Sequence, residues 1–272
     1  MTALALPSQF SARVDVNRSL GGGYVVLEFS GVSGGALGEV VAGQFVMLRG
    51  EWGRELLNPR AFSVLWSEPD GRFAVLLKAY GQGTSRLVAS PVGARVTVTG
   101  PLGRGFRPTD GAVTQLLVAG GVGLPPLHLQ ARQASARGQA ARLELFYGGR
   151  DRDDLVLLGD FEAWGVRSVL ATEDGSVGAR GFVTAPLEQR LVDARAAGEA
   201  VEILSCGPTP MLAAVRHIGL RHDVPTWLCL EEEMACGFGV CLGCAVPVHG
   251  ARPYQYCCSD GPVFEAKQVR WP

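Results

Sequence analysis

Short apolar runs alternate with polar residues through about the first hundred positions of the chain. The runs are rich in β-branched and aromatic side chains, and Gly, Pro and Asn interrupt them at short intervals. This spacing is typical of antiparallel strands joined by tight turns. Six short strands in this space favour a small closed barrel. The expected strands are residues 10–16, 24–29, 44–48, 62–66, 73–80 and 95–99.

The pattern changes between residues 112 and 225, where continuous apolar runs alternate with segments of helical periodicity. Strands buried on both faces alternate with helices in doubly wound parallel sheets. The expected strands are residues 115–119, 142–147, 168–172 and 201–205, and the expected helices are residues 125–136, 185–197 and 210–220.

From residue 226 the chain is rich in cysteine and in turns, which predicts a lobe that a bound metal helps to fold. At 272 residues and 47% apolar content, the chain is long enough for two domains and this lobe. The predicted fold class is therefore a β barrel plus an α/β domain. We expect an antiparallel barrel over residues 1–106, a doubly wound parallel domain over residues 107–225 and a small C-terminal lobe over residues 226–272.

Charge and cysteine content narrow the functional classes. The net charge is −1, with 19% charged residues, so neither a nucleic acid nor an anionic membrane is an expected partner. Residues 1–10 lack the features of a signal peptide, and no apolar run approaches the roughly 18 residues of a membrane span. Five of the seven cysteines lie within residues 236–258, which favours cofactor ligation in a reducing cytoplasm over a disulfide framework.

Three of these cysteines, Cys236, Cys241 and Cys244, have the order C-x4-C-x2-C, and a fourth thiol follows at Cys257 or Cys258. This is the ligand spacing of a plant-type [2Fe–2S] cluster, and the intervening glycines let the backbone direct amides at the sulfurs. A structural zinc site with four thiolates usually has two C-x2-C pairs, and a Rieske centre needs two histidines. The spacing therefore favours a cluster that carries one electron at a time.

Two motifs in the barrel region together suit a flavin diphosphate. Arg60 begins an expected strand, where a guanidinium can bind a pyrophosphate, and Ser63 can offer its hydroxyl to a ring nitrogen. Further along, Gly83 and Thr84 precede an expected helix that Thr84 would cap, and free amides at such a start bind phosphate. Taken alone, each motif has an ordinary alternative, a solvated arginine and a glycine-rich turn.

Two glycine-containing turns follow buried strands of the predicted sheet. The first is the turn of Gly120, Gly121 and Gly123, which opens a helix, and the second is Cys206-Gly207-Pro208. Both turns lie at the carboxyl ends of parallel strands, where dinucleotides bind. The first is not a strict G-x-G-x-x-G, and Cys206 alone reads as a small buried residue.

In this order, an R-x-F-S motif, a G-x-G-T loop, a G-G-V-G turn, a C-G-P-x-P-M turn and a cysteine-rich lobe resemble the ferredoxin–NADP reductase superfamily. Within it, residues 230–241 and 258–264 resemble the electron transfer subunits of dihydroorotate dehydrogenase B. The resemblance covers essentially the whole chain. It implies FAD on the barrel, NAD on the α/β domain and a [2Fe–2S] cluster in the C-terminal lobe.

The resemblance also implies roles for individual residues. It makes Cys258 the fourth cluster ligand and leaves Cys257 as an extra thiol, and it places Ala61 where the family more often has proline. The candidate catalytic residues are Ser63 and Cys206. The implied cluster ligands are Cys236, Cys241, Cys244 and Cys258. The implied FAD contacts are Arg60, Ala61, Phe62, Ser63, Leu77, Lys78, Ala79, Gly83 and Thr84. The nicotinamide contacts are Gly120, Gly121, Gly123, Cys206, Gly207 and Pro208.

The choice between NAD and NADP rests on opposite charges after the expected strand 142–147. Asp151 would repel the 2′-phosphate of NADP, whereas Arg150 would attract it. A surface ion pair of Arg150 with Asp151 or Asp153 is the alternative. The resemblance implies NAD, and we adopt it as the prediction.

The expected function is electron transfer in de novo pyrimidine biosynthesis. The resemblance implies a partner, an FMN-containing dihydroorotate dehydrogenase catalytic subunit, in a heterotetramer with two copies of each chain. Electrons would pass from the partner's FMN through [2Fe–2S] and FAD to NAD⁺. A flavin subunit of a hydrogenase or transhydrogenase-type complex is the nearer alternative. A zinc-binding interaction module without enzymatic activity is the alternative from another class.

Overall fold

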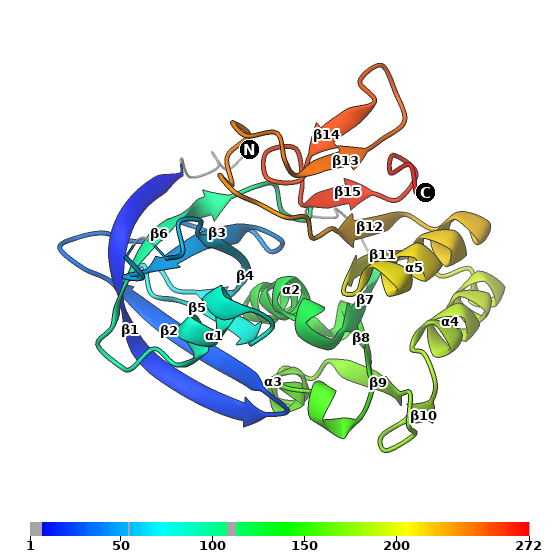
Figure 1. Cartoon of the computed structure of the whole chain (residues 1–272). Coiled ribbons are helices and arrows are strands. Elements are labelled where there is room, and N and C mark those ends of the chain that lie inside the picture. Colours follow the sequence, from blue (N-terminus) through cyan, green and yellow to red (C-terminus); the bar gives the residue numbers. More distant parts are fainter. Residues whose placement is uncertain (1–6, 54, 108–112, 272) are drawn as a thin grey trace.

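The computed structural model describes residues 7–53, 55–107 and 113–271, so residues 1–6 of the N-terminal segment considered above lie outside the described residues. Figure 1 shows a barrel in blue to cyan, a sheet with its helices in green to yellow, and a C-terminal lobe in orange to red. The lobe lies against both other parts. This architecture confirms the predicted combination of an antiparallel barrel, a parallel α/β fold and a small lobe.

Six antiparallel strands close the barrel in the order β1-β2-β5-β4-β3-β6. The strand β1 runs well past the expected residue 16, because hydrogen bonds to β2 hold its polar second half as far as Gly21. Helix α1 (Gln82–Val88) follows β5. The strands are β1 (Ser8–Gly21), β2 (Tyr24–Gly31), β3 (Phe45–Gly50), β4 (Arg60–Ser67), β5 (Phe73–Lys78) and β6 (Arg95–Leu102).

The second part is a seven-stranded sheet in the order β10-β9-β8-β7-β11-β12-β15. All neighbours pair in parallel except β12 and β15, which are antiparallel. The strands are β7 (Thr114–Gly120), β8 (Leu143–Gly149), β9 (Arg167–Thr172), β10 (Ala179–Arg180), β11 (Val201–Cys206), β12 (Thr226–Cys229) and β15 (Val263–Glu265). The helices are α2 (Pro125–Ala136), α3 (Leu158–Ala163), α4 (Thr184–Ala197) and α5 (Thr209–Arg221).

Alternate side chains of β7 serve two different cores, because successive residues of a strand face opposite sides of the sheet. Leu117 and Ala119 pack in the core that includes α2, α3 and the barrel interior. Leu116 and Val118 pack in the core that includes α4, α5 and the C-terminal lobe. Helices therefore cover both faces of the sheet, as the doubly wound prediction requires.

Four short elements of the sheet and its helices, α3, β10, β12 and β15, were not expected from the sequence, and α3 and β10 are the shortest helix and strand among them. Helix α3 has only six residues and begins after Leu157 at φ 60°, with no side-chain cap to mark its start. Strand β10 has two residues and pairs only with β9. Neither is long enough to show a periodic pattern.

The C-terminal lobe contributes to the sheet as well as forming a hairpin of its own. The hairpin pairs β13 (Ala245–Pro247) with β14 (Tyr254–Tyr256). The strand β15 then returns to pair with β12 at the edge of the sheet. Among the described residues, no helix is long and apolar enough to cross a membrane.

Candidate functional site

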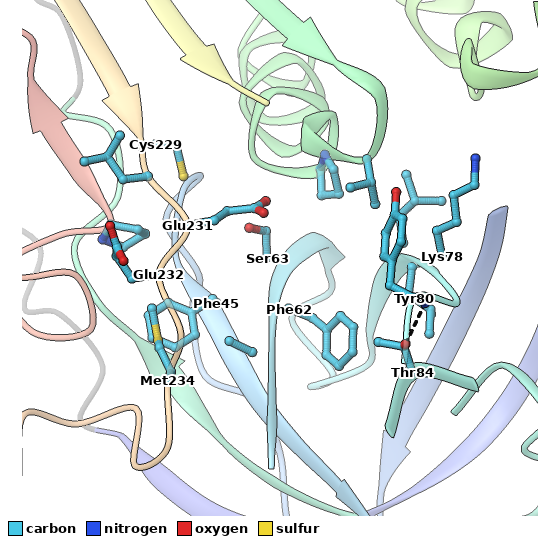
Figure 2. A pocket seen from close by; sticks show the side chains of 17 residues that line it. Phe45, Phe62, Ser63, Lys78, Tyr80, Thr84, Cys229, Glu231, Glu232 and Met234 are labelled. Carbon is cyan, nitrogen blue, oxygen red and sulfur yellow. Dashed lines mark hydrogen bonds between the residues drawn. The ribbon is translucent and has the colours of Figure 1, made fainter. Parts of the chain in front are cut away.

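A cavity of about 240 Å³ lies where the barrel, the sheet and the C-terminal lobe meet, and we call it the barrel cavity. Figure 2 shows side chains from β4 and β5 on one side and from the segment after β12 on the other. The predicted flavin contacts that line it are Ala61, Phe62, Ser63, Leu77, Lys78 and Thr84. Arg60, Ala79 and Gly83 are not among its lining residues.

The structure nevertheless brings the two predicted flavin motifs together. A Cβ atom on Gly83 would lie 2.7 Å from Nε of Arg60, so the guanidinium rests against this glycine. The segment just before β4 also holds the Arg60 side chain, because Nη1 of Arg60 donates to the carbonyl of Asn58 at 2.8 Å. A side chain at position 83 would push the guanidinium away.

The expected cap of helix α1 is wrong in detail. The helix begins at Gln82 with Gly81 as the N-cap, so Thr84 lies inside the first turn. Its hydroxyl accepts hydrogen bonds from the backbone amides of Tyr80 at 3.0 Å and Gly81 at 3.1 Å. Thr84 therefore fixes the turn that leads into the helix, since two amides that precede the helix bond to one side chain.

A second cavity of about 840 Å³ lies over the carboxyl ends of the parallel strands, and we call it the sheet cavity. It contains five of the six predicted nicotinamide contacts, Gly120, Gly121, Gly123, Gly207 and Pro208. The two glycine-containing turns that carry these residues touch each other. A Cβ on Gly123 would lie 2.5 Å from the carbonyl oxygen of Cys206, so only glycine permits this approach of the two strand ends.

The sixth predicted contact, Cys206, is fully buried and does not line the sheet cavity. It pairs in register with Cys229 on β12. The neighbouring thiol of Cys229, and burial, raise the pKa of Cys206 well above the usual range. The side chain is therefore a neutral thiol beneath the turn, and a catalytic role for it stays a prediction.

Further residues of the sheet cavity were not identified from the sequence. Phe182 is 70% exposed although it is a large aromatic residue, and it lines the cavity together with Glu173. Glu173 directly follows the carboxyl end of β9. The rule that ligands bind at the carboxyl ends of parallel strands could have identified Glu173, whereas Phe182 follows a two-residue strand that has no clear sequence signal.

Arg150 lines the sheet cavity, but its partner is neither of the predicted ones. Its Nε donates to Oδ2 of Asp154 at 2.9 Å, whereas Asp151 accepts from the amide of Asp153 at 3.0 Å and does not line the cavity. Asp154 also accepts from Lys78 at 3.0 Å and from the hydroxyl of Tyr24 at 3.1 Å. This carboxylate therefore joins the barrel to the sheet.

The surroundings of Asp154 favour its charged form. Burial raises its pKa, but hydrogen bonds from Arg150 and Lys78 outweigh burial and hold the pKa well below its usual value. Burial also raises the pKa of Tyr24, with the Asp154 charge and its hydrogen bond acting in the same direction, so the phenol stays a donor. Lys78, a predicted flavin contact, thus lines the barrel cavity while its amine bridges to the sheet.

The two cavities share a wall made of Tyr80, Val122 and Glu231. Figure 2 shows Glu231 and Ser63 extending into the barrel cavity from the segment after β12 and from β4. The Glu231 carboxyl is open to the cavities but crowded by protein on its other sides, and this desolvation raises its pKa. A carboxyl at this junction is a group that the sequence analysis did not single out.

The four predicted cluster ligands lie together in the C-terminal lobe as two pairs. The Sγ atoms of Cys244 and Cys258 are 3.2 Å apart, and the amide of Cys241 donates to Sγ of Cys236 at 3.5 Å. The amide of Gly239 donates to Sγ of Cys258 at 3.1 Å. Among the described residues, no three or more His, Cys, Asp or Glu side chains are grouped to hold one metal ion.

The backbone around these thiols directs amides at sulfur, and the thiols differ in pKa. Burial raises the pKa of Cys236, but the amides of Cys241 and Phe238 outweigh it and lower the pKa to about 6. Burial and the thiol of Cys244 raise the pKa of Cys258 to about 12. Amides directed at sulfur and a glycine-rich backbone, with Gly239 at φ 84°, fit the residues to an iron–sulfur cluster.

The extra thiol Cys257 points elsewhere. Its Sγ donates to the carbonyl of Leu230 at 3.2 Å, and the residue is fully buried. Cys258, the next residue, has its sulfur against Cys244. This difference in direction supports Cys258 over Cys257 as the fourth ligand.

Comparison with solved structures defines the class. A structure of NADH-dependent reduced ferredoxin–NADP oxidoreductase matches with a TM-score of 0.76 and 25% identity, covering 100% of this chain and 92% of that one. The ferredoxin reductase of carbazole 1,9a-dioxygenase matches with a TM-score of 0.70 and 27% identity, covering 82% and 68%. With its two cavities and cysteine lobe, the chain is a flavin- and NAD-linked electron-transfer oxidoreductase of the ferredoxin reductase type.

Sequence comparison specifies the family. Residues 117–217 match the oxidoreductase NAD-binding domain, and residues 231–270 match the iron–sulfur cluster binding domain of dihydroorotate dehydrogenase B. A protein of Caldanaerobacter subterraneus is 36% identical over 84% of this chain and 86% of its own length, and one of Lysinibacillus sphaericus is 38% identical over 83% and 86%. Both are dihydroorotate dehydrogenase B (NAD(+)) electron transfer subunits, and the chain belongs to this family.

Proposed function

We propose that this chain passes electrons between an NAD nucleotide in the sheet cavity and a [2Fe–2S] cluster in the C-terminal lobe, through FAD in the barrel cavity. The observation that carries the proposal is the common wall of Tyr80, Val122 and Glu231. Because one set of side chains faces both cavities, ligands in the two cavities lie next to each other. The segment that begins with Glu231 leads directly to the first cysteine ligand, Cys236.

The barrel cavity fits a flavin ring and the adjoining turn fits its diphosphate. Bound FAD exchanges a hydride with nicotinamide and single electrons with an iron–sulfur cluster. On this chain, Arg60 and the turn at Gly83 would bind the diphosphate, while the Ser63 hydroxyl would orient the ring edge. Glu231 would lie between the two ligands, because its side chain lines both cavities.

The C-terminal lobe fits a two-iron cluster. Cys236, Cys241, Cys244 and Cys258 would be the ligands, and the amides of Gly239 and Cys241 would bond to ligand sulfurs. The role of these amides would be to stabilise negative charge on sulfur, which raises the tendency of the site to accept an electron.

The partner is the catalytic subunit of dihydroorotate dehydrogenase B, which the family's name as an electron transfer subunit implies. We place FMN on that partner and two copies of each chain in the assembly. Electrons would run from dihydroorotate through the partner to this chain and to NAD⁺, in pyrimidine biosynthesis in the cytoplasm.

An exposed apolar surface beside the cluster ligands supports the docking of a partner. Phe238 is 57% exposed, Val240 72% and Leu242 52%, and all three alternate with the cysteine and glycine residues of the ligand loop. A group of exposed apolar side chains is more typical of an interaction site than single apolar residues scattered over a surface. Docking on this loop would bring the partner's redox group close to the cluster.

The experiment is reconstitution of electron flow. The purified chain should show flavin and iron–sulfur absorption, release FAD on heating, and reduce a dye with NADH. Mixed with the dihydroorotate dehydrogenase catalytic subunit, it should reduce NAD⁺ with dihydroorotate. A colourless zinc protein would contradict the cofactor assignment, and a coloured protein that accepts electrons only from a hydrogenase subunit would contradict the partner.

A further inference from the structure

The buried thiol of Cys257 lies between the pair of buried cluster ligands and the wall of the barrel cavity. On one side, its amide donates to the carbonyl of Cys244 at 2.9 Å, and its peptide bond leads to Cys258. On the other side, its Sγ donates to the carbonyl of Leu230 at 3.2 Å. Because a carbonyl can only accept, the contact requires the S–H form of this cysteine.

Leu230 belongs to the wall of the barrel cavity, with Cys229 before it and Glu231 after it. Its own amide donates to the carbonyl of Pro262 at 2.9 Å, so the strand end is fixed from the lobe on two sides. Cys257, the residue next to the cluster ligand Cys258, thus donates a hydrogen bond directly to the backbone of the barrel-cavity wall.

We propose that Cys257 is a positioning residue for electron transfer between the cluster and the flavin, acting through its hydrogen bond to Leu230. The inference rests on the proposed assignment of Cys244 and Cys258 as ligands. Electron transfer rates fall steeply with separation, and bonded connections carry electrons better than gaps between atoms. The bond provides a connected route from Cys258 through residue 257 to Leu230, and it holds the two sites at a fixed separation.

The chain offers a matched pair of variants to test this role. Cys257→Val and Cys257→Thr have side chains of nearly equal shape, but only threonine retains a donor. Cys257→Ser is a third variant, with a smaller side chain that also retains a donor. The full-length protein is purified with its cofactors, and iron, flavin and melting temperature are measured for each variant. NADH is then mixed rapidly with it, flavin reduction is followed by absorption, and cluster reduction is followed by electron paramagnetic resonance of frozen samples.

The expected result is a several-fold slower cluster reduction in Cys257→Val, with flavin reduction, iron content and cluster potential unchanged. Cys257→Thr or Cys257→Ser should recover most of the rate. A valine variant with the wild-type rate would overturn the proposal. Equal loss of iron or melting temperature in the valine and threonine variants would also overturn it, since packing would then be the role of Cys257. A wild-type protein without flavin or cluster would instead refute the proposed function.

Discussion

Adjacent cysteines of this chain have opposite environments. The sulfur of Cys258 lies against Cys244 and accepts from the amide of Gly239, whereas the sulfur of Cys257 donates to the carbonyl of Leu230. Adjacent residues often point in opposite directions, so one thiol can bind a cluster while its neighbour packs behind it. At the residue scale, the direction of a side chain separates two candidates that the sequence places side by side.

Iron content should follow this division. We expect that Cys236→Ser, Cys241→Ser, Cys244→Ser and Cys258→Ser each lose the cluster, because these four residues lie together as two pairs. Cys257→Ser should retain the cluster, because the sulfur of Cys257 points away to the carbonyl of Leu230. Iron and sulfide per chain, measured on each purified variant, check this. Loss of iron in Cys257→Ser with retention in Cys258→Ser would show that the fourth ligand is the other thiol.

Flavin retention should depend on Arg60. Its guanidinium lies against Gly83, so Arg60→Ala removes a charged donor from the expected diphosphate site. Loss of such a hydrogen bond costs about 1.5–3 kcal/mol, which corresponds to roughly 10- to 150-fold weaker binding of FAD. The measurements are the flavin content per chain and the dissociation constant of FAD, determined on protein from which the flavin has been removed. Arg86→Ala is the control, because Arg86 pairs with Glu55 outside both cavities and should leave FAD binding unchanged.

Nucleotide preference should depend on Glu173. The only cation lining the sheet cavity among the described residues, Arg150, is bonded to Asp154, whereas Glu173 contributes a carboxylate that would repel an added phosphate. We expect kcat/KM for NADH to exceed that for NADPH. Glu173→Gln should raise the NADPH value by roughly fivefold, about 1 kcal/mol, since the charges would interact across water. Asp151→Asn is the control, and a larger gain in that variant would restore Asp151 as the determinant.

At the scale of elements, the sheet cavity depends on how closely two strand-end turns approach. A Cβ on Gly123 would meet three backbone atoms, the carbonyl carbon and oxygen of Cys206 and the Cα of Gly207. Neither turn can move without shifting its strand, because β7 and β11 are hydrogen-bonded neighbours inside the sheet.

Gly123→Ala should therefore destabilise the protein by about 2 kcal/mol or more, because a methyl group 2.5 Å from a carbonyl oxygen forces the backbone apart. The melting temperature and NADH-dependent dye reduction should fall together. Gly159→Ala provides a matched control in helix α3, since its Cβ would meet no atom within 4 Å. An unchanged melting temperature in Gly123→Ala would show that the two turns are free to separate.

At the scale of the whole molecule, Asp154 joins the barrel to the sheet through Lys78 and Tyr24. Its pKa is lowered in the folded protein, so its contribution to stability is present above the unfolded pKa of about 3.9 and is lost as pH falls through the lower folded value. Asp154→Asn should reduce the unfolding free energy at pH 7 by about 1–3 kcal/mol and flatten its acid dependence below about pH 4.

Denaturant unfolding at pH 7 and at acid pH measures both effects. Asp70→Asn is the control, because its pair with Arg72 is exposed on both sides and contributes little. An acid dependence that is as steep in Asp154→Asn as in the wild type would place the titrating groups elsewhere.

Local patterns predicted much of this molecule and fewer of its long-range contacts. The helix expected at residues 125–136 is found as α2 (Pro125–Ala136), and the two glycine turns do meet at one sheet edge. The partner of Arg150 and the place of Glu231 between the cavities depend on how the barrel docks on the sheet. Such contacts join residues far apart in the chain, and neither propensity nor spacing encodes their geometry.

The antiparallel strand β15 has a consequence for the life of the protein in the cell. It covers the edge of β12, and it reaches that place only after the chain has passed through the cysteine lobe. During synthesis, the edge of β12 therefore stays open until the whole lobe has been made. Uncovered strand edges recruit other chains. Newly made copies would thus be most prone to associate with one another before the last residues of the lobe are in place.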